Sequence, residues 1–236
     1  MVLQLLNGLN KNKNMIIITG ASKGIGQFLY NKYINSSIDV IGTSNTTSTD
    51  NLIKLDVTNE SEVIDFFNKL PTNSRNLTLI NCAGINANAL TKKFDVESFK
   101  NVIDVNLVGT FLMAKHALAI MLDNKFGRII NISSVVPQIG IPGTAAYSAS
   151  KSALWGLSKT IAAENANKNI TCNCLNLGYF NVGMIKEVPE VALEKILAEI
   201  PMQKLGDPIN IYNAIEFLRI SDYITGTTID INGGLH

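Results

Sequence analysis

Short runs of apolar and β-branched residues alternate along the whole chain with longer segments whose apolar positions recur at helical spacing. The short runs are typical of buried strands, and the longer segments have the period of helices packed on one side. This alternation predicts right-handed crossovers and a parallel sheet with helices on both faces, an α/β doubly wound fold. Seven strands are expected at 15–19, 38–43, 52–56, 77–81, 128–133, 169–176 and 228–232, and helices at 24–34, 60–70, about 95–122, 146–166 and 210–220.

Composition favours a single folded unit. The chain has 236 residues, of which 46% are hydrophobic and 17% charged, a balance that suits one compact domain with a large core. We find no internal repeat, low-complexity tract or linker, and the polar stretch 43–51 is interpreted as a loop after a strand. We therefore expect one domain over 1–236, with 1–14 as an N-terminal extension.

Charge and hydropathy narrow the class of partner. The formal net charge is +1, with acidic and basic residues interspersed, so the chain offers no basic field to nucleic acid or to an anionic membrane. Residues 1–14 lack the basic region and cleavage site of a signal peptide, and no apolar run approaches the roughly 18 residues of a membrane span. These features predict a cytoplasmic protein that binds neither nucleic acid nor membrane.

Three cysteines, an odd number, fit reduced thiols better than a disulfide framework. Cys172 and Cys174 lie two apart in a predicted strand and thus on one face of it. Because no histidine or second cysteine pair completes a ligand set, we interpret them as core residues and predict no metal site.

A glycine-rich turn, TGASKGIG (19–26), follows the first predicted strand and opens the first helix. Gly20 permits a tight turn, Gly24 lets backbone approach a pyrophosphate, and Gly26 lets helix and strand pack closely. The free N–H groups of the helix start favour an anion there. A tight turn alone would need glycines for steric reasons. The strand before and the helix after favour a dinucleotide site.

Tyr147 and Lys151 are four residues apart in a predicted helix, so both project from one face. Lowering the pKa of a phenol from about 10 to near 7 takes roughly 4 kcal/mol, and one ammonium about 4 Å away supplies on the order of that amount. We therefore expect Lys151 to make Tyr147 a usable proton donor at neutral pH. The alternative is an ordinary solvated pair.

Five ordered motifs together resemble the classical short-chain dehydrogenase/reductase family, from about Met15 to Leu235. They are TGASKGIG, NCAG (81–84), NISS (131–134), YSASK (147–151) and NGG (232–234). The resemblance implies a Rossmann-like fold and hydride transfer between a nicotinamide cofactor and a carbonyl or alcohol carbon. Among family members, the segments GRIINISSVV, IPMQKLGDP and YITGTTIDINGG are most similar to 3-oxoacyl-acyl-carrier-protein reductases.

The resemblance assigns a role to each candidate catalytic residue. Tyr147 is the general acid, Lys151 modulates its pKa, and Ser134 donates to the substrate oxygen as charge develops there. Ser133 is the second candidate for the role of Ser134. The alternative for Ser133 is a hydroxyl at the end of a strand that bonds to the backbone. Asn106 resembles the asparagine that holds a water linking Lys151 to solvent; the alternative is a mid-helix irregularity, since asparagine competes with helix backbone.

Cofactor choice depends on the turn and on the second strand. No carboxylate follows that strand at 43–45, which removes the main signal for NAD, and Lys23 is placed to pair with a 2′-phosphate. We expect NADP(H) to be preferred over NAD(H), with Asp56 bonding the adenine amino group. Cys82 replaces a second asparagine of the family, and little loss of cofactor affinity is expected. The residues expected at the cofactor are Gly20, Ser22, Lys23, Gly24, Ile25, Gly26, Ser44, Asp56, Val57, Asn81, Ala83, Gly84, Tyr147, Lys151, Gly178, Phe180 and Val182.

The chain departs from the family after the sixth strand. Leu177 stands at the usual proline, and Val182 replaces the threonine that bonds the nicotinamide carboxamide, so only backbone groups near Phe180 and Val182 remain to orient the ring. The segment from about 183 to 200, with Met184, Ile185, Val188 and Leu193, resembles a substrate lid.

The resemblance also implies a homotetramer or homodimer built on the helices around 106–122 and 147–165, which carry apolar residues on more than one face. Leu235 and His236 are candidates for a further subunit contact, and His116 is interpreted as a packed or interface residue.

The leading prediction is an NADPH-dependent carbonyl reductase that acts on a ketone, with a 3-oxoacyl thioester as the preferred substrate class. Two alternatives stay open. One is a sugar, polyol or secondary-alcohol dehydrogenase of the same family, because such enzymes share these segments. The other is a non-catalytic dinucleotide-binding sensor or scaffold. The departures from the family at Leu177 and Val182 are compatible with this alternative.

Overall fold

The computed structural model describes residues 14–46, 51–70 and 76–235, and it contains one seven-stranded sheet in the order β3-β2-β1-β4-β5-β6-β7. Every neighbouring pair of strands is parallel. The order reverses between β1 and β4, which is where doubly wound folds bind ligands, outside the carboxyl ends of the strands. The strands are β1 (Asn14–Thr19), β2 (Asp39–Ser44), β3 (Leu52–Lys54), β4 (Asn76–Asn81), β5 (Gly127–Ser134), β6 (Ile170–Leu177) and β7 (Thr228–Ile231).

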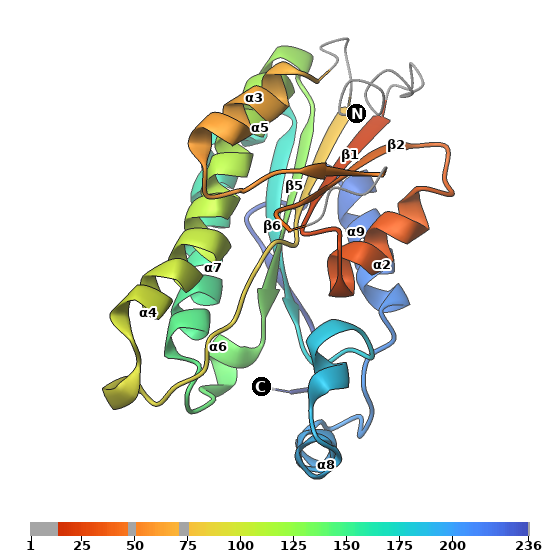
Figure 1. Ribbon diagram of the computed structural model, residues 1–236. Coiled ribbons are helices and arrows are strands. Elements are labelled where there is room, and N and C mark those ends of the chain that lie inside the picture. Colours follow the sequence, from red (N-terminus) through yellow and green to blue (C-terminus); the bar gives the residue numbers. More distant parts are fainter. Residues whose placement is uncertain (1–13, 47–50, 71–75, 236) are drawn as a thin grey trace.

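Helices cover both faces of the sheet, as Figure 1 shows. On one face, α3 (Glu60–Asn68), α5 (Gly109–Asn124) and α7 (Ala145–Asn165) bury a cluster that includes Phe66 and Met113. On the other, α2 (Gly24–Tyr33) and α9 (Ile209–Ile220) bury a second cluster around Leu29 and Ile215. The remaining helical elements are η1 (Thr91–Lys93), α4 (Val96–Ile103), η2 (Asp104–Val108), α6 (Val136–Ile139), η3 (Ala166–Lys168), η4 (Gly183–Glu187) and α8 (Glu190–Glu199).

These elements confirm the α/β doubly wound fold, with small changes at the boundaries. The third strand ends at Lys54 rather than at 56, because Asp56 already accepts hydrogen bonds from the turn that follows. Asn14 belongs to β1 and pairs in register with Asn76, so it is not part of an N-terminal extension. The rest of that expected extension, residues 1–13, lies outside the described part of the chain.

The long helix expected at 95–122 is a rod of three parts: α4, the π-helical turn η2 and α5. This rod, Val96–Asn124, has 29 residues and a hydropathy of 1.6 in its most apolar window, enough by length and composition to cross a membrane. Polar residues such as Asn106, Lys115 and His116 interrupt the rod, so it contains no uninterrupted apolar run of about 18 residues, as the sequence predicts. The same composition is typical of a core helix, and α5 buries Leu112, Met113 and Met121 against the sheet.

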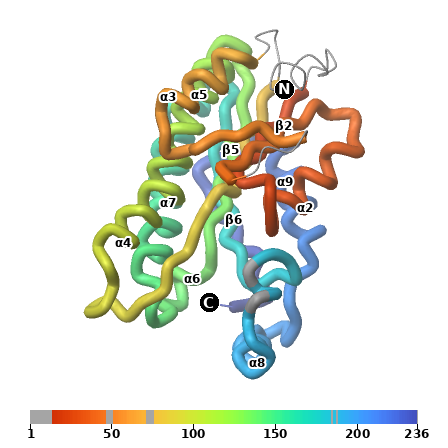
Figure 2. Tube along the Cα trace, viewed as in Figure 1, coloured from red at the N-terminus to blue at the C-terminus, as the bar shows by residue number. Residues whose placement is uncertain are grey.

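The segment expected to form a lid contains η4 and α8. Figure 2 shows α8 beyond the carboxyl ends of the strands, next to the turn that leads into it. The first residue of η4 also approaches the glycine turn, because a Cβ added at Gly24 would lie 3.5 Å from the Gly183 Cα. The segment thus begins beside the predicted cofactor turn.

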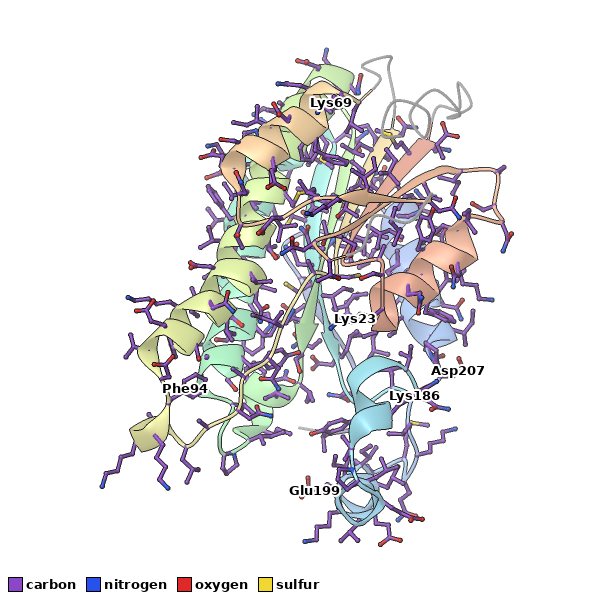
Figure 3. The ribbon with its side chains drawn as sticks, in the orientation of Figure 1. Lys23, Lys69, Phe94, Lys186, Glu199 and Asp207 are labelled. Atoms are coloured by element: carbon purple, nitrogen blue, oxygen red, sulfur yellow. The ribbon has the colours of Figure 1, made fainter. Side chains whose placement is uncertain are left out.

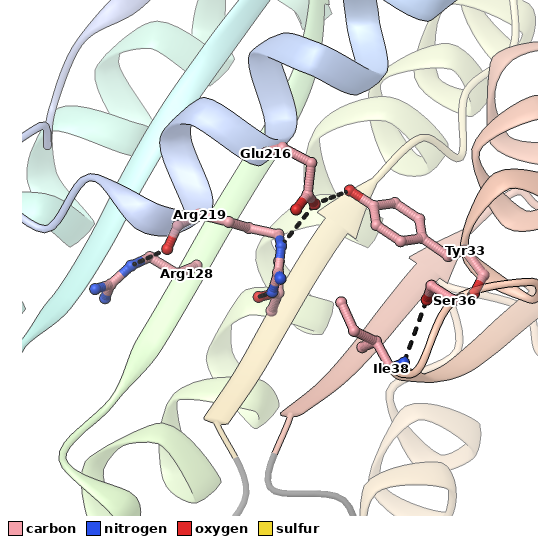
Figure 4. A network of polar contacts seen from close by, with 7 residues as sticks. Tyr33, Ser36, Ile38, Arg128, Glu216 and Arg219 are labelled. Atoms are coloured by element: carbon pink, nitrogen blue, oxygen red, sulfur yellow. Dashed lines mark hydrogen bonds and ion pairs between the residues drawn. The ribbon is translucent and has the colours of Figure 1, made fainter.

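Polar groups brace the opposite end of the sheet, where strands begin. The Tyr33 hydroxyl donates to Glu216 at 2.6 Å, the Arg219 Nε donates to the same carboxylate at 2.8 Å, and Arg128 Nε donates to the Arg219 carbonyl at 3.2 Å (Figure 4). These bonds join α2, α9 and β5 across one face. The amino end of the sheet is therefore fixed, and the loops at the carboxyl end carry the candidate site.

The remaining core predictions can be checked individually. Cys172 and Cys174 are buried free thiols, and burial raises the pKa of both, as expected for core residues. His116 is largely buried and stacks on Phe67 at 6.3 Å between ring centroids, which confirms a packed residue. Leu235 is buried as well, whereas His236 lies outside the described residues.

Candidate active site

The glycine turn after β1 has the backbone geometry that its sequence predicts. Gly20 is in the left-handed region, with φ of +67°, and a Cβ there would lie 2.8 Å from the Ala83 Cα. A Cβ at Gly26 would lie 2.3 Å from the Gly20 carbonyl oxygen, so α2 approaches the turn too closely for any side chain. Gly24 is also left-handed, with φ of +59°.

The start of α2 forms a cradle that fits a dinucleotide pyrophosphate. The first intrahelical bond of the helix is donated by Gln27, to the Lys23 carbonyl. The N–H groups of Gly24, Ile25 and Gly26 therefore precede the hydrogen-bonded turn and face outward from the helix end. Lys23 is the N-cap residue, and its side chain makes no cap bond. Figure 3 shows the Lys23 side chain near the carboxyl ends of the strands, between the two helical layers.

The segment NCAG is held against the turn through one hydroxyl. The Thr19 Oγ1 accepts from the N–H groups of Cys82 and Ala83, at 3.1 and 3.0 Å. Asn81 lies under this contact and is buried, with its Nδ2 donating to Asn131 Oδ1 at 2.9 Å. Its side-chain amide therefore links β4 to β5. Among buried side-chain nitrogen and oxygen atoms of the described residues, only Asn81 Oδ1 and Thr43 Oγ1 lack a hydrogen-bond partner.

Asp56 and Val57 begin the turn after β3. The Asp56 Oδ1 accepts from the N–H and the hydroxyl of Thr58, at 2.9 and 2.8 Å. Both bonds use one carboxylate oxygen, and the second oxygen of a carboxylate has acceptor sites of its own. Val57 is buried and packs against Gly109, where a Cβ would lie 2.6 Å from the valine side chain.

Tyr147, Lys151 and Ser134 come together at the carboxyl end of β5. Ser134 is the last residue of β5, and its Oγ accepts from the Val136 N–H at 3.2 Å, which leaves the hydroxyl proton free to be donated. Its hydroxyl is close enough to Tyr147 to lower the pKa of that phenol by hydrogen bonding. Lys151, four residues along α7, places its Nζ 5.8 Å from the centroid of the Tyr147 ring.

The pKa of Tyr147 differs from the expectation. Burial raises it above the ordinary value of 10.0, and this effect outweighs the lowering by Ser134. Lys151 is not among the causes of the shift in this pKa, and one of its three N–H donors is bonded to the Ile132 carbonyl at 2.7 Å. Lys151 is itself 5% exposed, and burial lowers its pKa to about 8. Tyr147 therefore holds its proton at neutral pH, while Lys151 still carries charge.

Asn106 lies in the π-helical turn η2 and is fully buried. Its Nδ2 donates to the Ile85 carbonyl at 2.9 Å and to Ser150 Oγ at 3.0 Å, and its Oδ1 accepts from the Ile85 N–H at 2.8 Å. The mid-helix irregularity is thus real, and it turns the amide toward the catalytic helix. Asn106 and Lys151 meet at Gly84, where a Cβ would lie 3.3 Å from Asn106 Oδ1 and 3.5 Å from Lys151 Nζ.

The two candidate serines face different surroundings. Ser133 Oγ donates to the Lys151 carbonyl at 2.9 Å and accepts from the Trp155 indole at 3.0 Å. Ser134 is the residue beside Tyr147, because successive side chains of a strand point to opposite faces. The geometry favours Ser134 as the residue that faces a substrate.

Residues 14–192 match the family model described as short chain dehydrogenase. The chain belongs to this family. A 3-oxoacyl-acyl-carrier-protein reductase of Buchnera aphidicola subsp. Schizaphis graminum is 33% identical over 238 residues, which cover 95% of this chain and 98% of the relative. The same-named protein of Rickettsia conorii is 36% identical over 230 residues, 93% and 95% of the two chains. Family membership identifies an NAD(P)-dependent oxidoreductase that acts on carbonyl or alcohol groups.

The short-chain dehydrogenase fold also brings together residues that sequence reasoning missed. Lys54 on β3 is the register partner of Ser44 at the end of β2, and its side chain is exposed. Ser44 itself is buried. Tyr179 lies near Tyr147, since its charge would raise the pKa of that phenol. Lys54 reaches its position through the pairing of β3 with β2, and Tyr179 through the loop after β6. Neither residue belongs to a sequence motif that could have identified it.

The segment after β6 is more constrained than expected. Gly178 packs on the NGG motif, where a Cβ would lie 2.7 Å from the Asn232 Cα. Phe180 is buried, and the Val182 N–H donates to its carbonyl at 2.7 Å. The N–H of Val182 is therefore already bonded, whereas the carbonyl of Phe180 keeps a second acceptor site. Leu177 is buried in the core as the last residue of β6.

Proposed function

We propose that the protein is an NADPH-dependent reductase that transfers hydride to the ketone of a 3-oxoacyl thioester. The observation that carries this proposal is the meeting of Tyr147, Lys151 and Ser134 at the carboxyl end of β5, beside the glycine turn. The similar proteins named as 3-oxoacyl-acyl-carrier-protein reductases support the choice of substrate class. A cytoplasmic location agrees with this chemistry.

In the proposed reaction each residue acts on the substrate oxygen or on its neighbour. Bound NADPH supplies the hydride. The Ser134 hydroxyl donates a hydrogen bond to the carbonyl oxygen, where negative charge grows. Tyr147 gives its proton to that oxygen, and the Lys151 ammonium stabilises the phenolate that remains. Lys151 then gives a proton to the Tyr147 phenolate, and Asn106 is proposed to hold a water through which solvent returns a proton to Lys151.

The function is tested by following NADPH and NADH oxidation by the purified protein with acetoacetyl thioesters, diketones and keto sugars. Turnover with the acetoacetyl thioesters is expected. Turnover with keto sugars or simple ketones alone would instead favour a sugar, polyol or secondary-alcohol enzyme. Tight NADPH binding without turnover on any substrate would favour a non-catalytic sensor.

The preference for NADPH is assigned to two lysines, Lys23 at the N-cap of α2 and Lys54 beside Ser44. Replacing Lys23 by alanine should weaken NADPH binding by about tenfold, because a charge-assisted bond to the 2′-phosphate is lost, and should change NADH binding less than twofold. Lys54→Ala should have a smaller effect in the same direction. Both are measured as Kd by fluorescence titration.

Lys32, near the last turn of α2, gives the matched control. It has the same charge on the same helix but lies at the far end, so Lys32→Ala should bind both cofactors like the wild type. Equal weakening of NADPH and NADH by Lys23→Ala would contradict the phosphate contact.

Val182 offers a gain-of-function test. Val182→Thr keeps the side-chain shape and adds a hydroxyl where the family has one. One added hydrogen bond of about 1 kcal/mol to the nicotinamide carboxamide should raise kcat/KM for NADPH about fivefold. Val96→Thr, the same change at an exposed position at the start of α4 and outside this segment, is the control. No gain in Val182→Thr would show that the ring is held in another way.

The segment 183–200 is proposed as the substrate lid, and its start beside Gly24 supports this assignment. Exposed apolar side chains further support a homotetramer or homodimer. They lie on α5 and η2 at Val108, Phe111 and Leu122, in the last turn of α9 at Phe217 and Ile220, and just beyond it at Tyr223. Among the described residues α7, the second helix expected at the interface, carries no large exposed apolar side chain.

Tyr223 is 99% and Ile220 78% exposed, so the end of α9 presents the most accessible of these patches. Ile220→Asp is expected to halve the assembled mass measured by light scattering after gel filtration. Ile34→Asp, an exposed apolar position at the end of α2, should leave the mass unchanged. A monomeric wild-type protein would contradict the assembly.

A further inference from the structure

One set of hydrogen bonds, the Trp155 network, connects five elements around the site. It consists of Ser133, Gln138, Trp155, Asn176 and Asp230. Its centre is the indole of Trp155 on α7, whose Nε1 lies 3.0 Å from Ser133 Oγ on β5 and 2.8 Å from Asn176 Oδ1 on β6. This shared donor joins the catalytic helix to two strands of the sheet.

One end of the network holds Lys151. Ser133 Oγ donates to the Lys151 carbonyl at 2.9 Å, and the carbonyl of the preceding residue, Ile132, accepts from Lys151 Nζ at 2.7 Å. Two consecutive residues of β5 thus fix both the backbone and the side-chain amine of Lys151. Neither Ser133 nor Lys151 is more than 5% exposed, so water does not replace these bonds easily.

The other end of the network reaches the element that follows Ser134. Asn176 Nδ2 donates to Asp230 Oδ1 on β7 at 2.9 Å. Gln138 Nε2 on α6 lies 3.3 and 3.4 Å from the two oxygens of the same carboxylate. Gln138 is four residues after Ser134, on the short helix that begins directly beyond it. The network therefore runs from the backbone of Lys151 to the helix next to Ser134.

The buried part of the network depends on its own members. Asn176 is 1% exposed, and its carbonyl oxygen and amide group are bonded to Trp155 and Asp230. Buried polar groups that satisfy one another specify a single arrangement, whereas removal of one partner leaves the others unpaired. Shortening any side chain of this set should therefore make the backbone and the amine of Lys151 more mobile.

We propose that Ser133, Trp155, Asn176 and Asp230 are positioning residues that fix Lys151 and Ser134 relative to Tyr147. None of them touches the reacting atoms in the proposed reaction, on which this inference rests. Small displacements of catalytic groups can cost up to about a hundredfold in rate, so a rigid brace at this point has a direct effect on turnover.

The test replaces Ser133 by alanine and Trp155 by phenylalanine, which keeps an aromatic side chain but removes the indole N–H. Each variant is expected to lower kcat about tenfold, with KM for NADPH within twofold of wild type. The alkaline limb of the pH profile should move upward, because a loosened Lys151 is better solvated and its pKa rises toward the ordinary value. Ser133→Thr, which keeps the hydroxyl, should restore most of kcat.

Ser152→Ala is the matched control. Ser152 is also a serine that bonds a carbonyl of α7, donating to Ala149 at 3.1 Å, but it lies outside the network and is only partly buried. Its kcat and pH profile should be those of the wild type. Values within twofold of wild type for both Ser133→Ala and Trp155→Phe would overturn the proposal.

Coupling between the two ends provides the sharper measurement. Asp230→Ala changes an exposed residue, so it should fold, and it should lower kcat about threefold. If the network acts as a unit, Ser133→Ala/Asp230→Ala should be little slower than Ser133→Ala alone. Ser152→Ala/Asp230→Ala should show the product of its single effects. Independent effects in the first pair would refute a connected network.

Hydrogen–deuterium exchange separates this inference from the proposed function. Faster exchange of α7 amides in residues 147–155 is expected in Ser133→Ala and Trp155→Phe, with α5 unchanged as an internal reference. If the wild-type protein does not turn over, both the reductase assignment and the catalytic role of the network are refuted. If the wild-type protein turns over and the variants show unchanged hydrogen exchange, only the positioning role is refuted.

Discussion

Replacing Tyr147 by phenylalanine is expected to abolish reductase turnover, with a loss of about a thousandfold or more, while the Kd for NADPH stays within a few-fold. The variant removes one oxygen from a phenol that burial keeps protonated at neutral pH, as its raised pKa shows. The ring, which packs beside Lys151, remains. Turnover is measured by NADPH oxidation with an acetoacetyl thioester, and binding by fluorescence titration.

Tyr179→Phe is the informative comparison for this prediction. Tyr179 is a second partly buried phenol close to Tyr147, and burial raises its pKa too. It has no lysine one helical turn away, so its variant should lose less than tenfold. Turnover near the wild-type rate in Tyr147→Phe would transfer the role of proton donor to another group.

Replacing Lys151 by methionine should lower kcat by about a hundredfold or more, because the phenolate left after proton transfer would have no adjacent cation. In the wild-type protein the same loss should appear as pH rises. Burial lowers the pKa of Lys151 from 10.5 to about 8, so the ammonium is present below pH 8 and is lost above it. Reductive kcat/KM should therefore fall above about pH 8.

The sign of the stability change distinguishes this loss from unfolding. Between pH 8 and 10.5 the unfolded chain binds more protons at Lys151 than the folded chain does, so this group makes the protein more stable as pH rises. Activity and this contribution to stability should thus move in opposite directions. A pH profile of Lys151→Met that retains the alkaline limb would assign the limb to another residue.

Much of the fold could be predicted because local pattern and tertiary structure agree. The runs at 15–19 and 77–81 are apolar enough to be strands buried on both faces, and they appear as β1 and β4 with a change of one residue at their starts. Strand order could not be predicted, because β1 lies between β2 and β4 through pairings that leave no local signal. The position of Lys54 beside Ser44 depends on that pairing.

The site shows the same division. The glycine turn was predicted residue by residue, since Gly20 and Gly26 are required by sterics that act within a few residues. The direction of the pKa shift of Tyr147 was predicted wrongly. Spacing along a helix tells how far apart two residues lie, but it does not tell how deeply the phenol is buried or which group the lysine side chain bonds. Lys151 turns to the Ile132 carbonyl, a partner nineteen positions away in the chain.

The π-helical turn at Asp104–Val108 lets one continuous rod change its neighbours midway. An α-helix advances by about 100° per residue, so the wider turn rotates everything beyond it around the rod axis relative to everything before it. Before the turn, α4 packs against α7; after it, α5 packs against β4, β5 and α3. A regular helix of the same length would direct one apolar face to the same side along its whole length. It could then pack against the sheet or against the catalytic helix α7, but not against both.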